Sequence, residues 1–324
     1  MSTSGQEMVE TVTAEQPEGA EPWHVKPSTV LSVQELAALN ARSDRQGWQQ
    51  FSAHLVVLLS SGALWGLNWG HWWVAMPALV VYGFSLASMF AALHECVHRT
   101  AFATQAVNDA VAWVAGVFSF YNSAFYRRYH KWHHRYTRLP GKDPELEDPA
   151  PQTWGDYLWQ MSGIPWWIGK VRGHLKILRG DFTGYPYISE AAQEEVRRSL
   201  ALQCAVYGGA IALSVIVGQP WFVTYWLLPL AVGQPILRFI LLAEHTGCTL
   251  DNNPLTNTRT TLTLWPIRLL MWNMPFHAEH HLYASIPFHA LPAAHAKVRD
   301  RLTHIAPGYV ATNRQIVSQL GTIA

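Results

Sequence analysis

The 324-residue chain is 49% hydrophobic and only 14% charged, and it carries 16 tryptophans and a formal net charge of +1. Soluble globular proteins average about 25% charged residues, so this composition argues against an ordinary soluble domain and favours a membrane protein. The small net charge gives no support for a nucleic-acid partner. Three cysteines without CxxC spacing exclude a disulfide framework and a cysteine-ligated iron–sulfur centre.

The N-terminal region differs in composition from the rest of the chain. Residues 1–30 contain five glutamates among small and polar residues, which predicts a disordered acidic tail. They contain no apolar core with a basic flank, so we expect no cleavable signal peptide. Ser32 and Glu35 have the spacing of a capping box, which predicts a short helix through Leu36 and Leu39. We expect residues 31–324 to form one membrane domain.

Four apolar stretches approach the roughly 20 residues that a helix needs to cross a bilayer. They cover residues 51–67, 72–93, 200–217 and 221–242. Gly70 and His71 separate the first pair, and residues 218–220 separate the second pair. The sequence therefore predicts an all-α integral membrane protein with four transmembrane helices in two hairpins.

The positions of lysine and arginine predict the sidedness of these hairpins. Of the 23 basic residues, three precede the first span, 13 lie between Arg99 and Arg198, six follow His245, and Arg238 lies within the fourth span. Neither short connection carries one. By the positive-inside rule, both termini and the long middle segment should be cytoplasmic, as in a multi-pass protein of a bacterial inner membrane or its equivalent.

Two weaker apolar stretches, 111–120 and 262–274, are too short to cross and are expected to form interfacial or re-entrant helices. A group of aromatic residues in the middle segment is expected to lie at the level of the lipid headgroups. Its members are Trp154, Tyr157, Trp159, Trp166 and Trp167.

Eight of the 16 histidines fall into three tight clusters. These are His94 and His98; His130, His133 and His134; and His277, His280 and His281. Residues at i, i+3 and i+4 project from one face of a helix, so each cluster can direct its imidazoles to one point. Eight ring nitrogens are too many for one tetrahedral ion and suit two metal ions in one pocket. The predicted topology puts all three clusters on the cytoplasmic side, in a helical cap.

The three clusters, in this order and spacing, resemble the histidine boxes of the membrane fatty acid desaturase and hydroxylase superfamily. The likeness extends past the second box, at Asp143-Pro-Glu145, and past the third, from Leu282 to Pro287. It covers roughly residues 50 to 305.

The resemblance implies two iron ions held by the boxes, with a ninth histidine near the end of the fourth span. The candidate here is His245. Acyl-CoA desaturases place an asparagine four residues earlier, where this chain has Leu241. We expect Glu95, Glu244, Glu279 and Asp143 to support ligand histidines, with surface salt bridges and direct ligation as alternatives for the glutamates.

The resemblance also implies that O2 and electrons are used to abstract hydrogen from a fatty acyl or lipid chain. Desaturation is the leading reaction; hydroxylation, decarboxylation to a terminal alkene, and oxygenation of a carotenoid or another lipid are alternatives. The electrons would come from an external donor such as ferredoxin, rubredoxin or cytochrome b5. Basic residues around the second box are expected to dock that donor or to meet anionic lipid. These are Arg127, Arg128, Lys131, Arg135, Arg138 and Lys142.

Arg238 is the charge within the apolar stretches and lies two turns before His245. It is a candidate for binding a substrate carboxylate or Glu244, and snorkelling to the interface is the alternative. His54 and His71 are expected away from the site, and His289 and His295 are expected to be packing or surface residues. A membrane metal-binding or transport protein is the alternative of another class, although its ligands would lie near the middle of the bilayer.

Overall fold

The computed structural model describes residues 30–321, so the expected acidic tail, apart from residue 30, lies outside the described residues. The first half contains α1 (Val33–Leu39), α2 (Asp44–Leu67), α3 (Trp72–Ala87), α4 (Met89–Val97), α5 (Gln105–Ser119), α6 (Ser123–Tyr136), η2 (Pro144–Glu147) and α7 (Trp154–Met161). The second half contains α8 (Ile164–Leu178), α9 (Glu190–Val217), the π-helical η3 (Val223–Leu227), α10 (Leu228–His245), β1 (Thr260–Thr261), α11 (Trp265–Leu270), α12 (His277–Leu282), η4 (Phe288–Ala290), α13 (Leu291–Val298), η5 (Arg299–Arg301), β2 (Ile305–Ala306) and α14 (Tyr309–Ser318).

Four helices are long and apolar enough to cross a membrane, which confirms the prediction of four apolar spans. They are Asp44–Leu67, Trp72–Val97, Glu190–Val217 and Val223–His245. Two of them are composite. The second contains α3 and α4, which meet at Ser88, and the fourth contains η3 and α10. The first three begin or end several residues beyond the apolar stretches, because helical hydrogen bonding continues into flanking polar residues.

The centre of the membrane region is formed by α3, which packs against α2 on one side and α10 on the other. Glycines permit the close approach of α3 and α10. A Cβ atom on Gly233 would overlap the backbone carbonyl of Gly83, and a Cβ on Gly83 would overlap the carbonyl of Pro229. The backbones of the two helices are thus in direct contact at this crossing.

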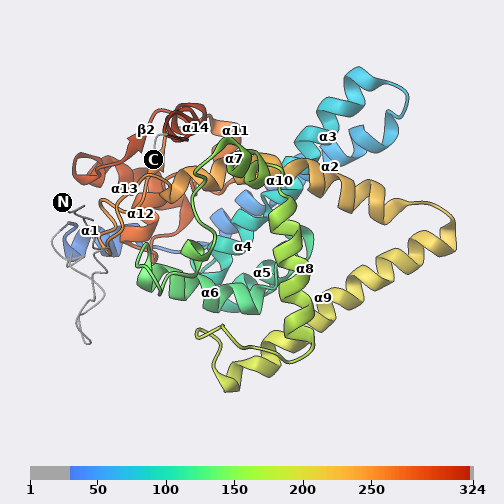
Figure 1. Cartoon of the computed structure of the whole chain (residues 1–324), viewed down its shortest axis with the longest axis horizontal. Coiled ribbons are helices and arrows are strands. Elements are labelled where there is room, and N and C mark those ends of the chain that lie inside the picture. Colours follow the sequence, from blue (N-terminus) through green and yellow to red (C-terminus); the bar gives the residue numbers. More distant parts are fainter. Residues whose placement is uncertain (1–29, 322–324) are drawn as a thin grey trace, which may run out of the picture.

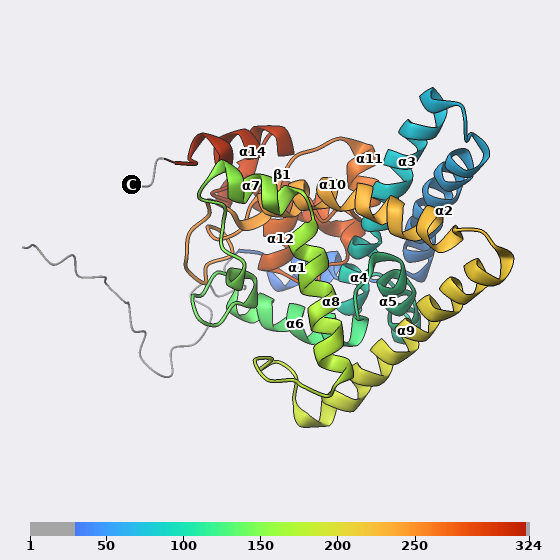
Figure 2. The ribbon, with the colours of Figure 1, turned by 45° about the vertical axis from the view of Figure 1, so that its right-hand side comes forward.

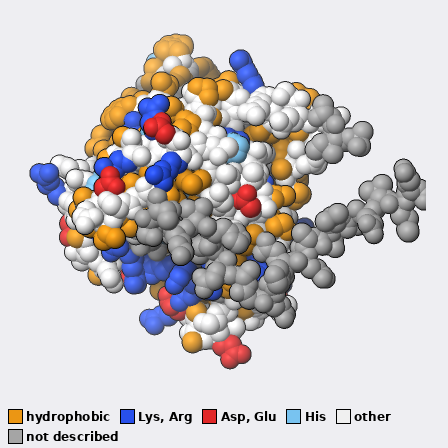
Figure 3. All heavy atoms as spheres, turned by 90° about the vertical axis from the view of Figure 1, so that its left-hand side faces the viewer, with side chains coloured by type: hydrophobic (Ala, Val, Ile, Leu, Met, Phe, Trp, Pro, Cys, Tyr) orange, Lys and Arg blue, Asp and Glu red, His pale blue; other side chains and the backbone are white. Residues whose placement is uncertain are grey.

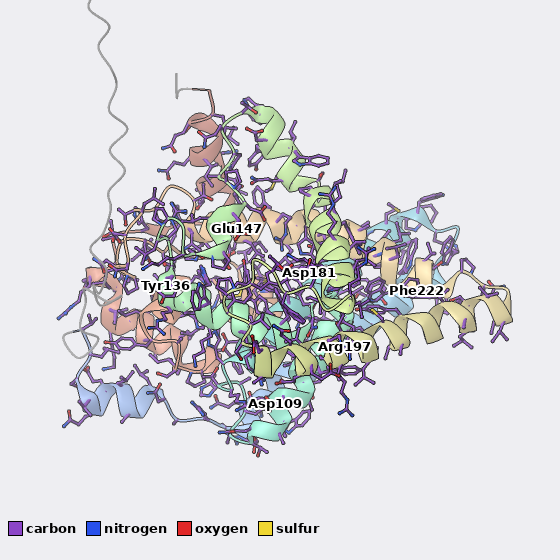
Figure 4. The ribbon with its side chains drawn as sticks, turned by 60° about the horizontal axis from the view of Figure 1, so that its bottom comes forward. Asp109, Tyr136, Glu147, Asp181, Arg197 and Phe222 are labelled. Carbon is purple, nitrogen blue, oxygen red and sulfur yellow. The ribbon has the colours of Figure 1, made fainter. Side chains whose placement is uncertain are left out.

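The other long span, α9, diverges from α10 after the connection at Gly218 (Figures 1 and 2). Arg197 lies near the start of α9, and Phe222 lies just beyond its end (Figure 4). Much of α9 is exposed, including apolar side chains such as Val215 and Ile216. Apolar side chains that no protein covers suit contact with lipid.

The connections of the two long helix pairs lie at the same end of the molecule, on the right of Figure 1. The opposite end carries lysine and arginine side chains interspersed with acidic ones (Figure 3). This end also contains a short parallel pairing of β1 with β2, at Thr260–Ile305 and Thr261–Ala306. The expectation of an all-α chain is therefore corrected to a mostly helical one with one two-residue pairing.

Outside the spans, several local expectations are met only in part. The capping box between Ser32 and Glu35 is present and begins α1. The stretch 111–120 falls largely in α5, whereas only Trp265–Leu270 of the stretch 262–274 is α-helical. Trp154 and Trp159 are exposed, but Trp166 and Trp167 pack against the central core. The second pair is therefore less available to lipid headgroups than expected.

His54 joins α2 to two other segments. Its Nε2 lies 2.8 Å from the Ser85 carbonyl on α3, and its Nδ1 accepts a hydrogen bond of 3.1 Å from the Trp272 indole. Trp272 and Asn273 both have a left-handed backbone, with φ values of 51° and 56°, and turn the chain between α11 and α12. His54 thus fixes the turn that precedes the third histidine cluster.

Candidate dimetal centre

Four segments that are distant in sequence bring the predicted ligand histidines together. The C-terminal end of α4 provides His94 and His98, and α10 ends at His245. The other histidines come from α6 (His130, His133, His134) and α12 (His277, His280, His281). Helix α6 is capped by Asn122, the residue before its start, whose side chain accepts hydrogen bonds from the backbone N–H groups of Ala124 and Phe125.

The histidines form two adjacent groups. The first group is His94, His98, His130, His134 and His280, and the second contains His133, His245 and His281; within each group the potential ligand atoms lie within 4.8 Å of one another. His277 adjoins the second group, since its Nε2 lies 3.2 Å from Nε2 of His245 and 3.1 Å from Nε2 of His281. All nine predicted residues thus lie in one pocket, five around one point and four around another.

The outward-facing ring nitrogens of several histidines have protein partners. Asp143 Oδ1 lies 2.8 Å from His133 Nδ1, and the Asn257 carbonyl lies 3.1 Å from His245 Nδ1. Thr137 Oγ1 lies 3.2 Å from His281 Nδ1 and donates its own hydrogen to the His133 carbonyl. These acceptors place the ring protons on Nδ1, which leaves the Nε2 lone pairs facing the pocket.

Polar side chains also lie beside the first group, although Nδ1 of His94 and Nδ1 of His280 form no hydrogen bond within residues 30–321. Glu95 is completely buried, and its Oε1 lies 3.3 Å from His94 Nδ1 and 3.9 Å from His280 Nδ1. The Tyr126 hydroxyl lies 3.3 Å from His130 Nδ1. The Glu95 carboxylate therefore faces one ring of the first histidine box, on α4, and one ring of the third box, on α12.

Burial determines the protonation of most of these rings. It holds the pKa values of six histidines well below their usual range: His98, His130, His134, His277, His280 and His281. Burial also lowers the pKa of His133, but the nearby Glu145 and Asp143 carboxylates raise it by more. A neutral imidazole has the free lone pair that metal ligation requires.

The ring nitrogens that face the pocket are better suited to metal ligation than to hydrogen bonding with one another. His130 and His134 approach to 3.0 Å between Nε2 atoms, and His134 and His280 approach to 3.1 Å. The Nε2 atoms of His94 and His98 are buried without a hydrogen-bond partner among residues 30–321. Buried lone pairs that converge in this way are stabilised by a cation. The two groups of imidazoles could therefore each hold a metal ion.

The remaining predicted residues lie at different distances from the pocket. Glu244 Oε2 is 3.5 Å from His277 Nε2. Glu279 faces no histidine of the boxes; it contacts Thr260 and His295 instead. His295, expected to be a packing or surface residue, is therefore part of a buried network beside α12. Neither contact could be predicted from a local sequence pattern, because Thr260 is 19 residues and His295 is 16 residues away from Glu279.

Asp143 connects one ligand candidate to its loop. Besides His133, it accepts the backbone N–H groups of Arg138 and Glu145. Burial alone would raise the pKa of this carboxyl, but the His133 ring and the two N–H donors hold it below its usual range. Asp143 is thus anionic when it orients the ring.

We expect Asp143→Asn to lower metal affinity or turnover roughly 10- to 100-fold, because it removes the charge that orients His133 and preserves the shape of the side chain. Metal content per chain and turnover of purified protein measure the effect. Glu147→Gln, at an exposed position close by in η2 (Figure 4), is the matched control and should change neither. Equal metal content and activity in both variants would contradict the positioning role.

Comparisons with known proteins match most of the chain. The family model described as "Fatty acid desaturase" matches residues 38–313. The sn-1 oleoyl-lipid 12-desaturase of Picosynechococcus sp. is 27% identical over 75% of this chain and 76% of its own length. The dihydrorhizobitoxine desaturase of Bradyrhizobium elkanii is 26% identical over 74% of this chain and 70% of its own. The Delta(5) fatty acid desaturase fat-4 of Caenorhabditis elegans is 22% identical over 69% of this chain and 57% of its own length.

Proposed function

The chain belongs to the fatty acid desaturase family, and from this premise we propose that its nine clustered histidines hold two iron ions. Family membership makes it a membrane oxidoreductase that acts on lipid. Two irons held here would supply the activation of O2 and the removal of hydrogen from an unactivated carbon. The observation that carries the proposal is the convergence of two groups of buried ring nitrogens in one pocket.

The protein's own part is to fix the histidine rings before substrate arrives. His133, His245 and His281 are oriented by Asp143, Asn257 and Thr137. Glu95 faces one ring on α4 and one on α12. Rigid histidines would hold the metals in one place. The carbon that is oxidised is then decided by how the lipid chain is positioned relative to the metals. Desaturation is the proposed reaction, and hydroxylation or decarboxylation would use the same ligands.

We also propose that both helix pairs enter the membrane from the cytoplasm, where the histidine cap and the termini lie. The basic residues of the middle segment and the common direction of the two connections support this topology. Family membership and the concentration of histidines at one end of the spans argue against the alternative of metal transport.

An external electron donor would dock near α6. Of the six basic residues around the second box, Arg127 pairs with Asp109 and Arg128 with Glu195. Lys131, Arg135 and Lys142 are exposed and remain available for an acidic protein such as a ferredoxin.

The decisive experiment supplies purified protein with iron, O2, a reducing system and saturated lipids, and identifies the products by mass spectrometry. Loss of two hydrogens is the expected result and means desaturation. Gain of one oxygen would mean hydroxylation, and loss of the carboxyl carbon would mean alkene formation. Protein that binds two irons but consumes O2 without forming any lipid product would contradict the proposal.

A further inference from the structure

Helix α10 carries two polar side chains with unsatisfied atoms inside the membrane region. Gln234 is completely buried, and neither its amide oxygen nor its amide nitrogen has a hydrogen-bond partner among residues 30–321. Arg238, one turn later, has buried and unpartnered Nε and Nη2 atoms. Buried polar groups are normally paired, so these atoms suggest that a polar group of a ligand completes them. Two of the three guanidinium nitrogens of Arg238 are shielded from solvent, which supports the binding alternative over snorkelling.

A second cation approaches the same region from α8. The first residues of α8 lie beside α10, where a Cβ on the preceding Gly163 would be 3.1 Å from Gln234 Cβ (Figure 2). The Arg238 guanidinium carbon is 5.9 Å from the centre of the Trp166 ring. One turn further along α8, Lys170 Nζ lies 3.5 Å from the centre of the Tyr121 ring. The Trp166 indole donates a 3.0 Å hydrogen bond to the Tyr121 hydroxyl, so the two cations flank one aromatic pair.

Neither cation has an ion pair among the described residues. The charge of Arg238 acts on Glu145 and Glu244, but neither forms an ion pair with it; Glu145 approaches His133 and Glu244 approaches His277, each at 3.5 Å. Burial, together with the positive charge of Arg238, lowers the pKa of Lys170 to about 7, against a smaller opposing effect of Asp148. Two cations that flank one aromatic pair without an ion pair, one of them with two guanidinium nitrogens shielded from solvent, form an environment that favours an anion.

We propose that Arg238 and Lys170, with the Gln234 amide, form a subsite for the oxyanion of the lipid substrate, either the carboxylate of a free fatty acid or the phosphate of a phospholipid. The proposal rests on the proposed function and deepens it by naming the anionic head of the substrate. Guanidinium groups bind carboxylate and phosphate through parallel hydrogen bonds, and an ammonium adds a point charge. The aromatic pair between the cations would cover the first methylene groups.

The position of this subsite restricts where the chain is oxidised. Arg238 precedes His245 by seven residues, which corresponds to about 10 Å along the helix. The anionic head therefore lies close to the histidine pocket, and the oxidised carbon belongs to the half of a long chain that is nearer the head.

Direct binding tests the subsite without requiring turnover. Iron-loaded protein is titrated with radiolabelled dodecanoate, with its methyl ester, and, in nanodiscs, with a phosphatidylglycerol. The variants are Arg238→Gln and Lys170→Gln, and the matched control is Arg172→Gln at an exposed position of α8. We expect either cation variant to weaken binding of one anionic lipid at least about tenfold, with ester binding and iron content unchanged. The control should match the unmodified protein.

Each outcome has a defined meaning. Weaker dodecanoate binding identifies the carboxylate, and weaker phosphatidylglycerol binding alone identifies the phosphate. Unchanged affinity for both anions would overturn the subsite, and so would loss of iron from Arg238→Gln, which would make Arg238 a structural partner of Glu145 and Glu244. Failure of the proposed function is separate, because it would appear as iron-loaded protein that binds lipid and never converts it.

Discussion

Replacement of His280 by alanine is expected to reduce bound metal from two ions to about one per chain and to lower turnover by at least two orders of magnitude. His280 Nε2 lies 3.1 Å from His134 Nε2 within the five-histidine group, and its Nδ1 faces the buried Glu95. Its removal would take away one ligand and leave Glu95 with a single imidazole neighbour. Loss of a mere orienting partner of a metal ligand already costs roughly 10- to 100-fold, so loss of a ligand should cost more.

Metal analysis and turnover of the same preparation measure this effect, and size-exclusion chromatography establishes that the variant is folded. His71→Ala is the matched control, because His71 is exposed in the connection between α2 and α3. A folded His280→Ala protein that retains two metals and full activity would refute the assignment of His280 as a ligand.

The second large effect is expected at the helix crossing, where Gly233→Ala should destabilise the protein by about 1–3 kcal/mol or more. The added methyl group would overlap the Gly83 carbonyl, which belongs to the backbone and cannot move by a side-chain rotation. The two helices would have to separate, and α10 carries His245 at its end. Overpacking of a tight interface generally costs this amount, and backbone overlap lies at the upper end.

The thermal unfolding midpoint in detergent and the fraction of monodisperse protein report the change. Gly208→Ala on α9 is the control, because no atom lies within 4 Å of the added Cβ there. Alanine is preferred to glycine inside a helix, so this control should be neutral or slightly stabilising. Equal stability of both variants would mean that α3 and α10 do not approach as closely as described.

The spacing of the histidines predicts that each cluster converges on one point, because i, i+3 and i+4 positions share a helix face whatever the tertiary structure. That the three clusters meet is expected from the topology, and His245 from the family resemblance. The division of the histidines into five and four was not predictable in the same way. His133 and His134 are adjacent in sequence but belong to different groups. Which group each joins depends on the rotation of α6 relative to α4, α10 and α12, and that rotation is set by packing.

The same limit applies to the partners of the histidines. Glu95 could be proposed as a support for His94 from the sequence because the two residues are adjacent, and its Oε1 lies 3.3 Å from His94 Nδ1. The His281 partner Thr137 lies 144 residues away in sequence, and no local pattern connects the two. Lys170 was likewise not singled out, since it is one of many basic residues in the middle segment until α8 is seen to lie beside α10.

The assembly of the pocket from four separate segments has a consequence for the biogenesis of the protein. One metal held by α4, α6 and α12 and another held by α6, α10 and α12 would together cross-link the two transmembrane pairs, the segment between them and the segment after the last span. The free energy of metal binding would then contribute to folding. The ligands from α12 follow the last span, so the pocket is completed only after every span has been synthesised. Iron supply to the cell would then set the amount of stable protein as well as its activity, and newly inserted chains without metal would be the form that membrane proteases recognise.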